Sequence, residues 1–438
     1  MIVVKTNHDS NRLQYACRVF FTQIMQIPWR ISGELSDEIQ PDNIVVSYGC
    51  EDDRAKVYIP RSGLLDEKGV HPISHKSDRW NGVATLFHIE GGPGLPFDLF
   101  SAVFFLASRY EEYLPFKADR NGRFEADQST MWEFGFLETP IIDIWAEHFK
   151  DYLANHGVTG EFPKRQYRFI STIDVDSAYA YRYKGLMRTL GGFAKDLLAF
   201  DLKNAGRRMS TLIGRTHDPY DTYDELKRIY STDKIEAIFF FLMADYGLND
   251  KNVPHTSVKY QLLIKDLADH FETGVHPGFM SNTKRELLTI EIERLSQIVH
   301  RQIVKSRQHF LILNLPDTYS RLLEQGVTDD YSMGFASQPG FRLGTCTPIP
   351  FYNLRTEQTT PLILHPFSVM DATLNMYMNL TPKEAIERIQ AVADAVKRVN
   401  GEFITVWHNE SISEAWHWKG WSKVFKETTQ YAAALREN

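Results

Sequence analysis

The sequence has few cysteines and no long apolar run. Three cysteines (Cys17, Cys50 and Cys346) occur in 438 residues, and their spacing fits no zinc motif. The longest apolar run, AIFFFLMA at 237–244, is far shorter than the roughly 20 residues that a membrane helix needs. The N-terminal MIVVKTNHDSNR lacks the apolar core of a signal peptide. We therefore expect no disulfide framework, no membrane insertion and a reducing, cytoplasmic location.

An excess of positive charge is also absent. The chain carries 49 Lys and Arg against 56 Asp and Glu, which gives a net charge of −7. Proteins that bind nucleic acid usually carry a basic patch, so this balance argues against a nucleic-acid partner. Hydrophobic residues make up 43% of the chain, enough for sizeable cores. The aromatic content of 13% suits core packing first and a sugar-binding cleft second.

Several common catalytic motifs are missing from the sequence. It contains no G-x-S-x-G elbow, no Walker-type phosphate loop and no H-E-x-x-H zinc motif. The GGPG stretch at 91–94 lacks the strand-loop-helix context of a dinucleotide fingerprint, and we interpret it as a turn. The chemistry must therefore come from residues that are spread along the chain.

The chain length predicts two or three domains. Residues 1–157 are interpreted as a smaller mixed α+β domain of unknown role, with a polar linker at about 155–166. In this part we expect strands at 44–49, 56–60 and 83–89. A buried helix should follow Asp98, its N-cap, and another should cover IDIWAEHFKDYLAN and end at Gly157.

From Tyr167 onward, strands alternate with helices, a pattern that predicts a parallel sheet, either open or closed into a barrel. Residues 177–233 are interpreted as a largely helical insertion in this 167–438 domain. Two later helices carry capping-box patterns, one formed by Thr283 with Glu286 and one by Thr381 with Glu384.

Residue types suited to metal binding and acid-base chemistry fall where the expected strands of this second domain end. Asp174 and Asp176 end FISTIDVD and point to one side of an extended chain. Two carboxylates so close together raise one another's pKa unless a positive charge lies nearby. The simpler alternative is that one of them caps the next helix. His276, Arg307, His309 and His408 also lie at or near strand ends, where parallel α/β proteins place their ligands.

TIDVD, ETGVHPGF, SRQHFLIL and FITVWHN together resemble the motifs of NodB-type polysaccharide deacetylases, which form carbohydrate esterase family 4. The resemblance covers roughly Tyr167 to the end of the chain. It implies an α/β fold with a distorted (β/α) barrel, here preceded by the smaller N-terminal domain. It also implies a divalent metal, usually Zn, and removal of acetyl groups from an acetylated sugar or polysaccharide.

The resemblance assigns roles to individual residues. It implies that Asp174 is the catalytic base, that Asp176 and His276 bind the metal, that Arg307 orients the base and that His408 is the general acid. The family has a second His four residues after the first, and this chain has Met280 there.

His309 is our candidate for the missing ligand, because it would share a strand face with Arg307. Each of these histidines has a structural alternative, since a lone imidazole is often satisfied within a core or a loop. Similarity to a bacterial subgroup with an extra N-terminal domain adds three candidate substrate-binding residues, Asp330, Arg342 and Asp371. Trp407, the neighbour of His408, is a fourth candidate. Capping and loop bracing are the alternatives for Asp371 and Arg342.

The leading hypothesis is therefore a metal-dependent carbohydrate deacetylase whose partner is an acetylated carbohydrate. Two alternatives remain open: a catalytically inactive carbohydrate-binding or scaffold protein on the same fold, and a hydrolase of non-sugar amides. The sequence predicts neither the exact substrate nor the oligomeric state.

Overall fold

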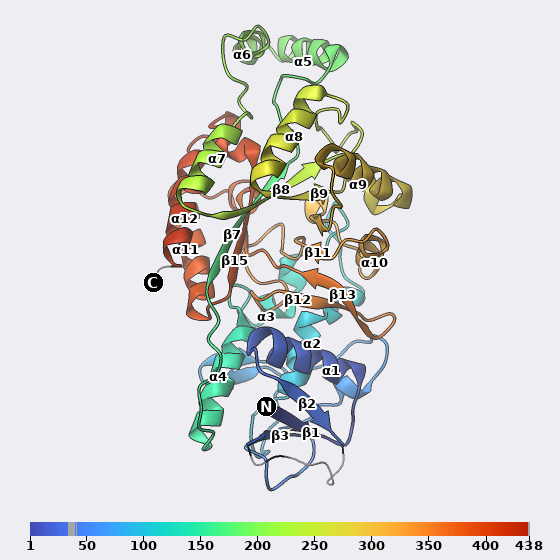
Figure 1. The fold of residues 1–438 in the computed structure, drawn as a ribbon, viewed down its shortest axis with the longest axis vertical. Coiled ribbons are helices and arrows are strands. Elements are labelled where there is room, and N and C mark those ends of the chain that lie inside the picture. Colours follow the sequence, from blue (N-terminus) through green and yellow to red (C-terminus); the bar gives the residue numbers. More distant parts are fainter. Residues whose placement is uncertain (34–39, 41, 437–438) are drawn as a thin grey trace.

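The computed structural model describes residues 1–33, 40 and 42–436, and Figure 1 shows their arrangement. Two main sheets are present, a four-stranded one near the N-terminus and a nine-stranded one that carries most of the rest of the chain. Among the described residues, no helix is both long and apolar enough to cross a membrane.

The nine-stranded sheet follows the order β12-β13-β11-β10-β9-β8-β7-β15-β14. All neighbours in this order pair in parallel except β12 and β13, which are antiparallel. Its strands are β7 (Arg168–Val175), β8 (Glu236–Leu242), β9 (Glu272–His276), β10 (Lys305–Ser306), β11 (Asp329–Asp330), β12 (Ile349–Asn353), β13 (Gln358–Leu364), β14 (Val369–Met370) and β15 (Glu402–His408). The mixed α/β class is as expected. Because β12 and β14 end the strand order of the described chain, closure into a barrel stays a prediction.

The helices of this part of the chain include the expected helical insertion, which begins after β7. They are α5 (Leu186–Leu198), α6 (Leu202–Leu212), α7 (Tyr223–Thr232), α8 (Val258–His270), α9 (Arg285–Val299), α10 (Asp317–Glu324), α11 (Pro382–Arg398) and α12 (Trp421–Ala434). Figure 1 shows α5 and α6 standing out at one end of the molecule, opposite the N-terminal sheet.

Strand β7 is an interior strand of the large sheet, between β8 and β15. Side chains alternate along it, so Ile170 belongs to a small core cluster on one face while Ile173 belongs to the large core on the other. Asp174 shares the face of Ile170, and Asp176 follows two residues later. A single apolar strand therefore delivers both carboxylates to the same side of the sheet.

The N-terminal segment holds a parallel sheet of order β2-β1-β3-β4, formed by β1 (Ile2–Lys5), β2 (Trp29–Ser32), β3 (Ile44–Tyr48) and β4 (Val57–Ile59). An antiparallel pair, β5 (Asp78–Trp80) and β6 (Val83–Thr85), follows. The helices are α1 (Asn11–Cys17), α2 (Leu99–Ala107), α3 (Thr130–Glu133) and α4 (Ile141–Asn155). We predicted β3, β4 and β6 but missed β1 and α1. The all-parallel main sheet also differs from the α+β arrangement that we expected.

Of three capping predictions, two are confirmed and one is wrong. Asp98 caps α2 by accepting a hydrogen bond from the backbone N–H of Ser101, and Thr381 with Glu384 forms a complete capping box at α11. The box predicted at Thr283 is wrong. The hydroxyl of Thr283 donates to the carbonyl of Met280 instead. Helix α9 begins at Arg285 without a side-chain cap.

The N-terminal segment and the large sheet share one hydrophobic core cluster, which includes Phe104 of α2 and Tyr352 of β12. These two rings meet edge to face with centroids 5.2 Å apart. Buried ion pairs cross the same boundary, since Arg12 binds Glu357 and Glu112 binds Arg342. Residues 156–167 link α4 to β7 without a helix or strand of their own. The two parts pack against each other, so the division into two domains at this link stays a prediction.

Candidate metal centre

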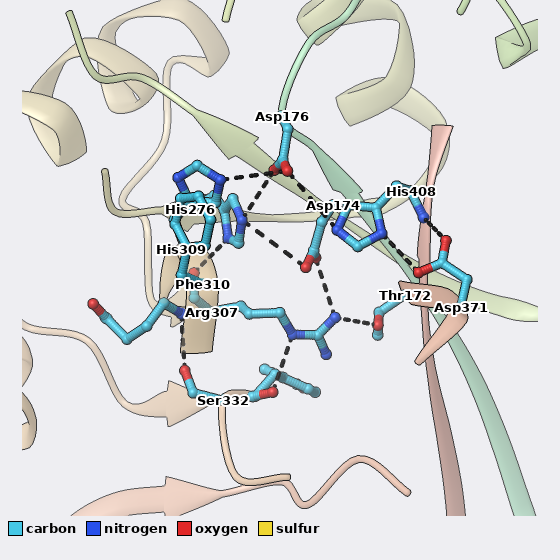
Figure 2. A network of polar contacts seen from close by, with 12 residues as sticks. Thr172, Asp174, Asp176, His276, Arg307, His309, Phe310, Ser332, Asp371 and His408 are labelled. Atoms are coloured by element: carbon cyan, nitrogen blue, oxygen red, sulfur yellow. Dashed lines mark hydrogen bonds and ion pairs between the residues drawn. The ribbon is translucent and has the colours of Figure 1, made fainter. Parts of the chain in front are cut away.

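The carboxyl ends of neighbouring parallel strands bring the candidate residues together. In the strand register, His408 of β15 lies beside Asp174 of β7, and His276 ends β9, the next strand but one on the other side. Arg307 follows β10, and His309 begins a short 3-10 turn, η6 (His309–Leu311). Side chains from five parts of the sequence therefore converge on one sheet edge, as Figure 2 shows.

Asp176, His276 and His309 form a compact group of three candidate ligands. One ligand atom from each lies within 4.8 Å of the others. The Nε2 atom of His276 is 3.2 Å from Oδ1 of Asp176, and Nε2 of His309 is 3.4 Å from Oδ2 (Figure 2). Burial by itself would raise the pKa of Asp176, but the facing imidazoles of His309 and His276 hold that pKa well below its usual range.

Hydrogen bonds fix the orientation of both imidazoles. Nδ1 of His276 donates to the backbone carbonyl of Arg307 at 2.6 Å, and Nδ1 of His309 lies 2.9 Å from Oδ1 of Asp250. Nε2 of each ring therefore faces Asp176. Burial would lower the pKa of His309, but Asp176 and Asp250 raise it to about 9, so a bound cation would take the place of the proton on Nε2. Metal-binding histidines typically have their other ring nitrogen held by a hydrogen bond in this way.

The donor set fits a divalent cation. One carboxylate and two neutral imidazoles make up a three-ligand set that suits zinc and leaves a position open for water or substrate. Oδ1 of Asp176 is buried and, within the described chain, has no hydrogen-bond partner of acceptable geometry. A cation between the three side chains would satisfy that oxygen.

Asp174 lies beside this group and is held by Arg307. The guanidinium donates from Nη1 to Oδ1 of Asp174 at 3.1 Å and to the hydroxyl of Thr172 at 2.5 Å. Arg307 is fully buried and lies over the ring of Phe240. Burial lowers the pKa of Arg307, although Asp174 opposes that change. The other oxygen of Asp174, Oδ2, lies 4.0 Å from Nε2 of His276 and faces the candidate ligands.

His408 lies on the side of Asp176 away from His276 and His309, and it pairs with Asp371. Nδ1 of His408 is 2.8 Å from Oδ1 of Asp371, and the backbone N–H of His408 donates to Oδ2. Burial would lower the pKa of His408, but Asp371 and then Asp176 raise it well above its ordinary value. Nε2 of His408 lies 3.8 Å from Asp176, so the imidazole presents its free nitrogen to the centre of the site.

The site opens into a cavity of about 820 Å³. Its lining includes both aspartates and all three histidines of the sheet edge. One wall comes from the N-terminal segment, at Asp119–Asn121, Arg123 and Glu125. Arg123 fixes that wall, because it donates to the carbonyl of Phe310 and to the hydroxyl of Tyr377. The segment of unknown role therefore shapes the space in front of the candidate metal ligands.

The four expected substrate-binding residues are not part of the cavity lining, and each side chain contacts another part of the protein. Asp330 is fully buried, accepts hydrogen bonds from Ser306, Ser332 and Tyr319, and has its pKa raised by burial. Arg342 forms a buried bidentate pair with Glu112.

Trp407 points to the face opposite that of His408, because strand side chains alternate, and it packs against Phe425 of α12. Asp371 forms hydrogen bonds with the ring and the backbone N–H of His408 and so holds that residue in place. The structure thus gives all four an internal partner, in place of the substrate contact that we expected.

Two features of the site escaped the sequence reasoning. Asp250 was missed because it lies in the loop after β8 rather than at a strand end, and no motif marks it. The N-terminal wall was missed because no motif in the polar run around Asp119 marks a contact with the second half of the chain. Met280, which stands where the family has its second His, is 45% exposed in the turn after β9 and takes no place among the candidate ligands.

Residues 2–157 match a family of unknown function (DUF7033). No curated protein matches the chain. The family match covers little more than a third of the residues, and it assigns no activity.

The structural neighbours include carbohydrate esterase family 4 proteins. A protein named as a polysaccharide deacetylase, from Mycobacterium smegmatis, has 15% identity and a TM-score of 0.41, with 63% of this chain and 87% of that chain covered. A family 4 carbohydrate esterase from Streptomyces lividans, in complex with acetate, has 10% identity and a TM-score of 0.30, with 62% and 91% covered. A family 4 pseudoenzyme from Bacillus anthracis has 10% identity and a TM-score of 0.29, with 61% and 62% covered. At these values the similarity transfers no residue role.

Proposed function

We propose that this protein is a metal-dependent hydrolase that removes acetyl groups from an acetylated carbohydrate. The observation that carries the proposal is the hydrogen bonding of His276 and His309. Arg307 and Asp250 occupy both Nδ1 atoms, which leaves both Nε2 atoms directed at Asp176. Neutral, oriented imidazoles beside a carboxylate are what a zinc ion requires. When bound, such a cation would supply Lewis-acid activation of water and of the carbonyl group.

The other side chains would perform the proton transfers. Asp174, held in place by Arg307, would accept a proton from the attacking water through the oxygen that faces the ligands. His408 would donate a proton from Nε2 to the departing amine or alkoxide. Asp371 holds the other nitrogen of His408, fixing the ring orientation and stabilising the charged imidazolium. A base and an acid that lie beside each other and both face the candidate ligands suit hydrolysis of an amide or ester.

The cavity supports a carbohydrate as the substrate class. Its volume of about 820 Å³ lies within the usual range for small-molecule sites. Tyr377 and Phe310 offer aromatic surfaces in the lining, while Asn121 and Glu410 offer polar groups. A sugar needs both, since its ring faces are apolar and its edges carry hydroxyl groups.

Metal content per chain is the first test. Elemental analysis of the full chain after incubation with zinc should give about one ion in the wild type. Asp176→Ala, His276→Ala and His309→Ala should each lose most of it. His255→Ala serves as the matched control, because this histidine pairs with Asp245 outside the cluster and its loss should leave the metal in place.

Activity on acetylated oligosaccharides then tests the reaction. Asp174→Asn should retain the metal and lose about 10²–10⁴-fold in kcat, the usual contribution of a general base. Activity on small non-sugar amides alone would favour the amide-hydrolase alternative. A chain that takes up no metal even from excess zinc, yet binds sugar, would replace this proposal with the inactive binding-protein alternative.

A further inference from the structure

The hairpin formed by α5 and α6 has its polar side inside and its apolar side outside. Between the two helices, Asp196 is buried and accepts hydrogen bonds from Arg208 at 2.8 Å and Asn204 at 2.9 Å. The large apolar residues of α5 and of the turn after it are instead exposed: Leu186, Met187, Leu190, Leu197, Leu198 and Phe200. Leu198 is 81% exposed and Phe200 is 89% exposed. So many exposed apolar side chains on one hairpin indicate a binding partner.

Basic residues surround this apolar surface. Residues 182–217 contain eight Lys or Arg and two Asp, for a net charge of +6. The whole chain carries −7, so the other 402 residues carry −13. Lys195 and Lys203, one on each helix, are both exposed. The positive charge of this otherwise acidic protein is therefore concentrated on the element that exposes the most apolar surface.

We propose that the α5–α6 hairpin docks the protein onto the surface of an anionic lipid bilayer. The apolar side chains would enter the boundary between headgroups and acyl chains, and the surrounding Lys and Arg would lie at the lipid phosphates. Helices of 13 and 11 residues are about 20 and 16 Å long, which suits lying in the interface rather than spanning it. This surface attachment was not foreseen from the sequence, which predicted only that no segment inserts across a membrane.

Charge decides between a membrane and a second copy of the chain. A twofold dimer through this face would bring two +6 surfaces together, because such an interface pairs the same patch from each copy. An anionic bilayer offers the opposite charge and an apolar layer in one surface. The membrane therefore complements both the positive charge and the apolar side chains of the hairpin, whereas a second copy complements only the apolar side chains.

The base of the hairpin is tied to the rim of the cavity. Arg188 of α5 donates to the backbone carbonyls of Lys251 and Asn252 at 2.9 and 2.7 Å, and its guanidinium lies 3.9 Å from the ring centre of Tyr246. Lys251 itself lines the cavity. Docking through the hairpin would consequently hold the cavity close to the bilayer. The docking proposal stands on the hairpin alone and does not depend on metal binding or on hydrolysis.

Flotation of the full chain with lipid vesicles tests the inference. Wild-type protein should float with vesicles of phosphatidylcholine and phosphatidylglycerol in equal parts, should not float with phosphatidylcholine alone, and should be released by high salt. The double variant Leu198→Glu with Phe200→Glu should bind at least about a hundredfold more weakly. Lys195→Glu with Lys203→Glu should also weaken binding to the anionic vesicles.

The matched control is Leu262→Glu with Ile290→Glu, which makes the same kind of change at exposed positions of α8 and α9. It should bind vesicles like the wild type. Absence of wild-type binding, or equal loss in the hairpin and control variants, would overturn the proposal. So would a wild-type dimer in sedimentation that Leu198→Glu with Phe200→Glu converts to a monomer without any vesicle binding, because a second copy would then cover this face.

Discussion

Asp250 illustrates how a single carboxylate can decide whether an imidazole binds metal. It is buried and lies 2.9 Å from Nδ1 of His309, which fixes the tautomer and directs Nε2 toward Asp176. The orientation of His276 is fixed by the backbone carbonyl of Arg307, which no side-chain substitution can remove. Asp250 is thus the second-shell partner that mutagenesis can reach.

We predict that Asp250→Asn weakens zinc binding by about 10–100-fold without changing the ligands themselves, as is typical for loss of a second-shell carboxylate. Competition with a chromophoric chelator would measure the affinity. Asp245→Asn is the control, because Asp245 belongs to the same loop but pairs with Arg294. Equal affinities in the wild type and Asp250→Asn would show that His309 needs no carboxylate partner.

At the scale of the element, the two capping-box patterns show what a short motif can and cannot specify. Thr381 and Glu384 bond reciprocally, with Pro382 beginning α11. Thr283 and Glu286 have the same spacing, yet the turn at Phe279–Asn282 extends into Thr283 and its hydroxyl is used there. The motif therefore works only where the preceding chain arrives in an extended conformation.

We predict that Thr381→Ala lowers the free energy of unfolding by about 1 kcal/mol, the usual cost of losing an N-cap side chain. Thr283→Ala should lower it by much less, because no helix cap is lost. Urea unfolding followed by circular dichroism would compare the two variants. Equal destabilisation would mean that Thr283 caps α9 in solution after all.

At the scale of the whole molecule, a buried cluster of charges joins the N-terminal segment to the large sheet. Glu112 accepts hydrogen bonds from Arg342 at 2.6 and 2.8 Å and from Arg109 at 2.7 Å. Burial would raise the pKa of Glu112, but Arg342 and Arg109 overcome it and lower the pKa to about 2. Breaking such a pair leaves buried arginines without a counter-charge.

The lowered pKa of Glu112 makes stability depend on pH in a defined direction. The contribution of the carboxylate is fully present above its unfolded pKa of about 4.5 and is lost as the pH falls from there toward 2. We predict that Glu112→Gln lowers the unfolding free energy at neutral pH by about 3 kcal/mol and removes this part of the acid dependence. Urea titrations from pH 7 to pH 3 would measure it.

Glu147→Gln is the control for this pH experiment. Glu147 pairs with Lys150 but is 43% exposed, so its loss should change stability little at any pH. An acid dependence that is unchanged in Glu112→Gln would contradict the assignment of that dependence to the buried pair.

The local sequence was sufficient to find β7 and β15 and the polar residues at their ends. It did not predict the 3-10 turn that carries His309, which we expected to lie on a strand. FISTIDVD and FITVWHNE are apolar runs that stop at charged residues, so their lengths and their polar ends could be predicted without tertiary information. Alternation along the strand could also have excluded Trp407, because it neighbours His408 and must face the other way.

The tertiary structure alone decided which of these residues meet. His309 reaches Asp176 because the chain turns sharply after β10, and Asp250 reaches His309 across 59 residues of sequence. Arg342 and Asp330 became internal partners because Glu112, Ser306 and Tyr319 were brought to them from other elements. Local patterns fix the conformation of a segment and the identity of its polar ends. The partner of a buried charge depends on the packing of distant segments, which no short stretch of sequence encodes.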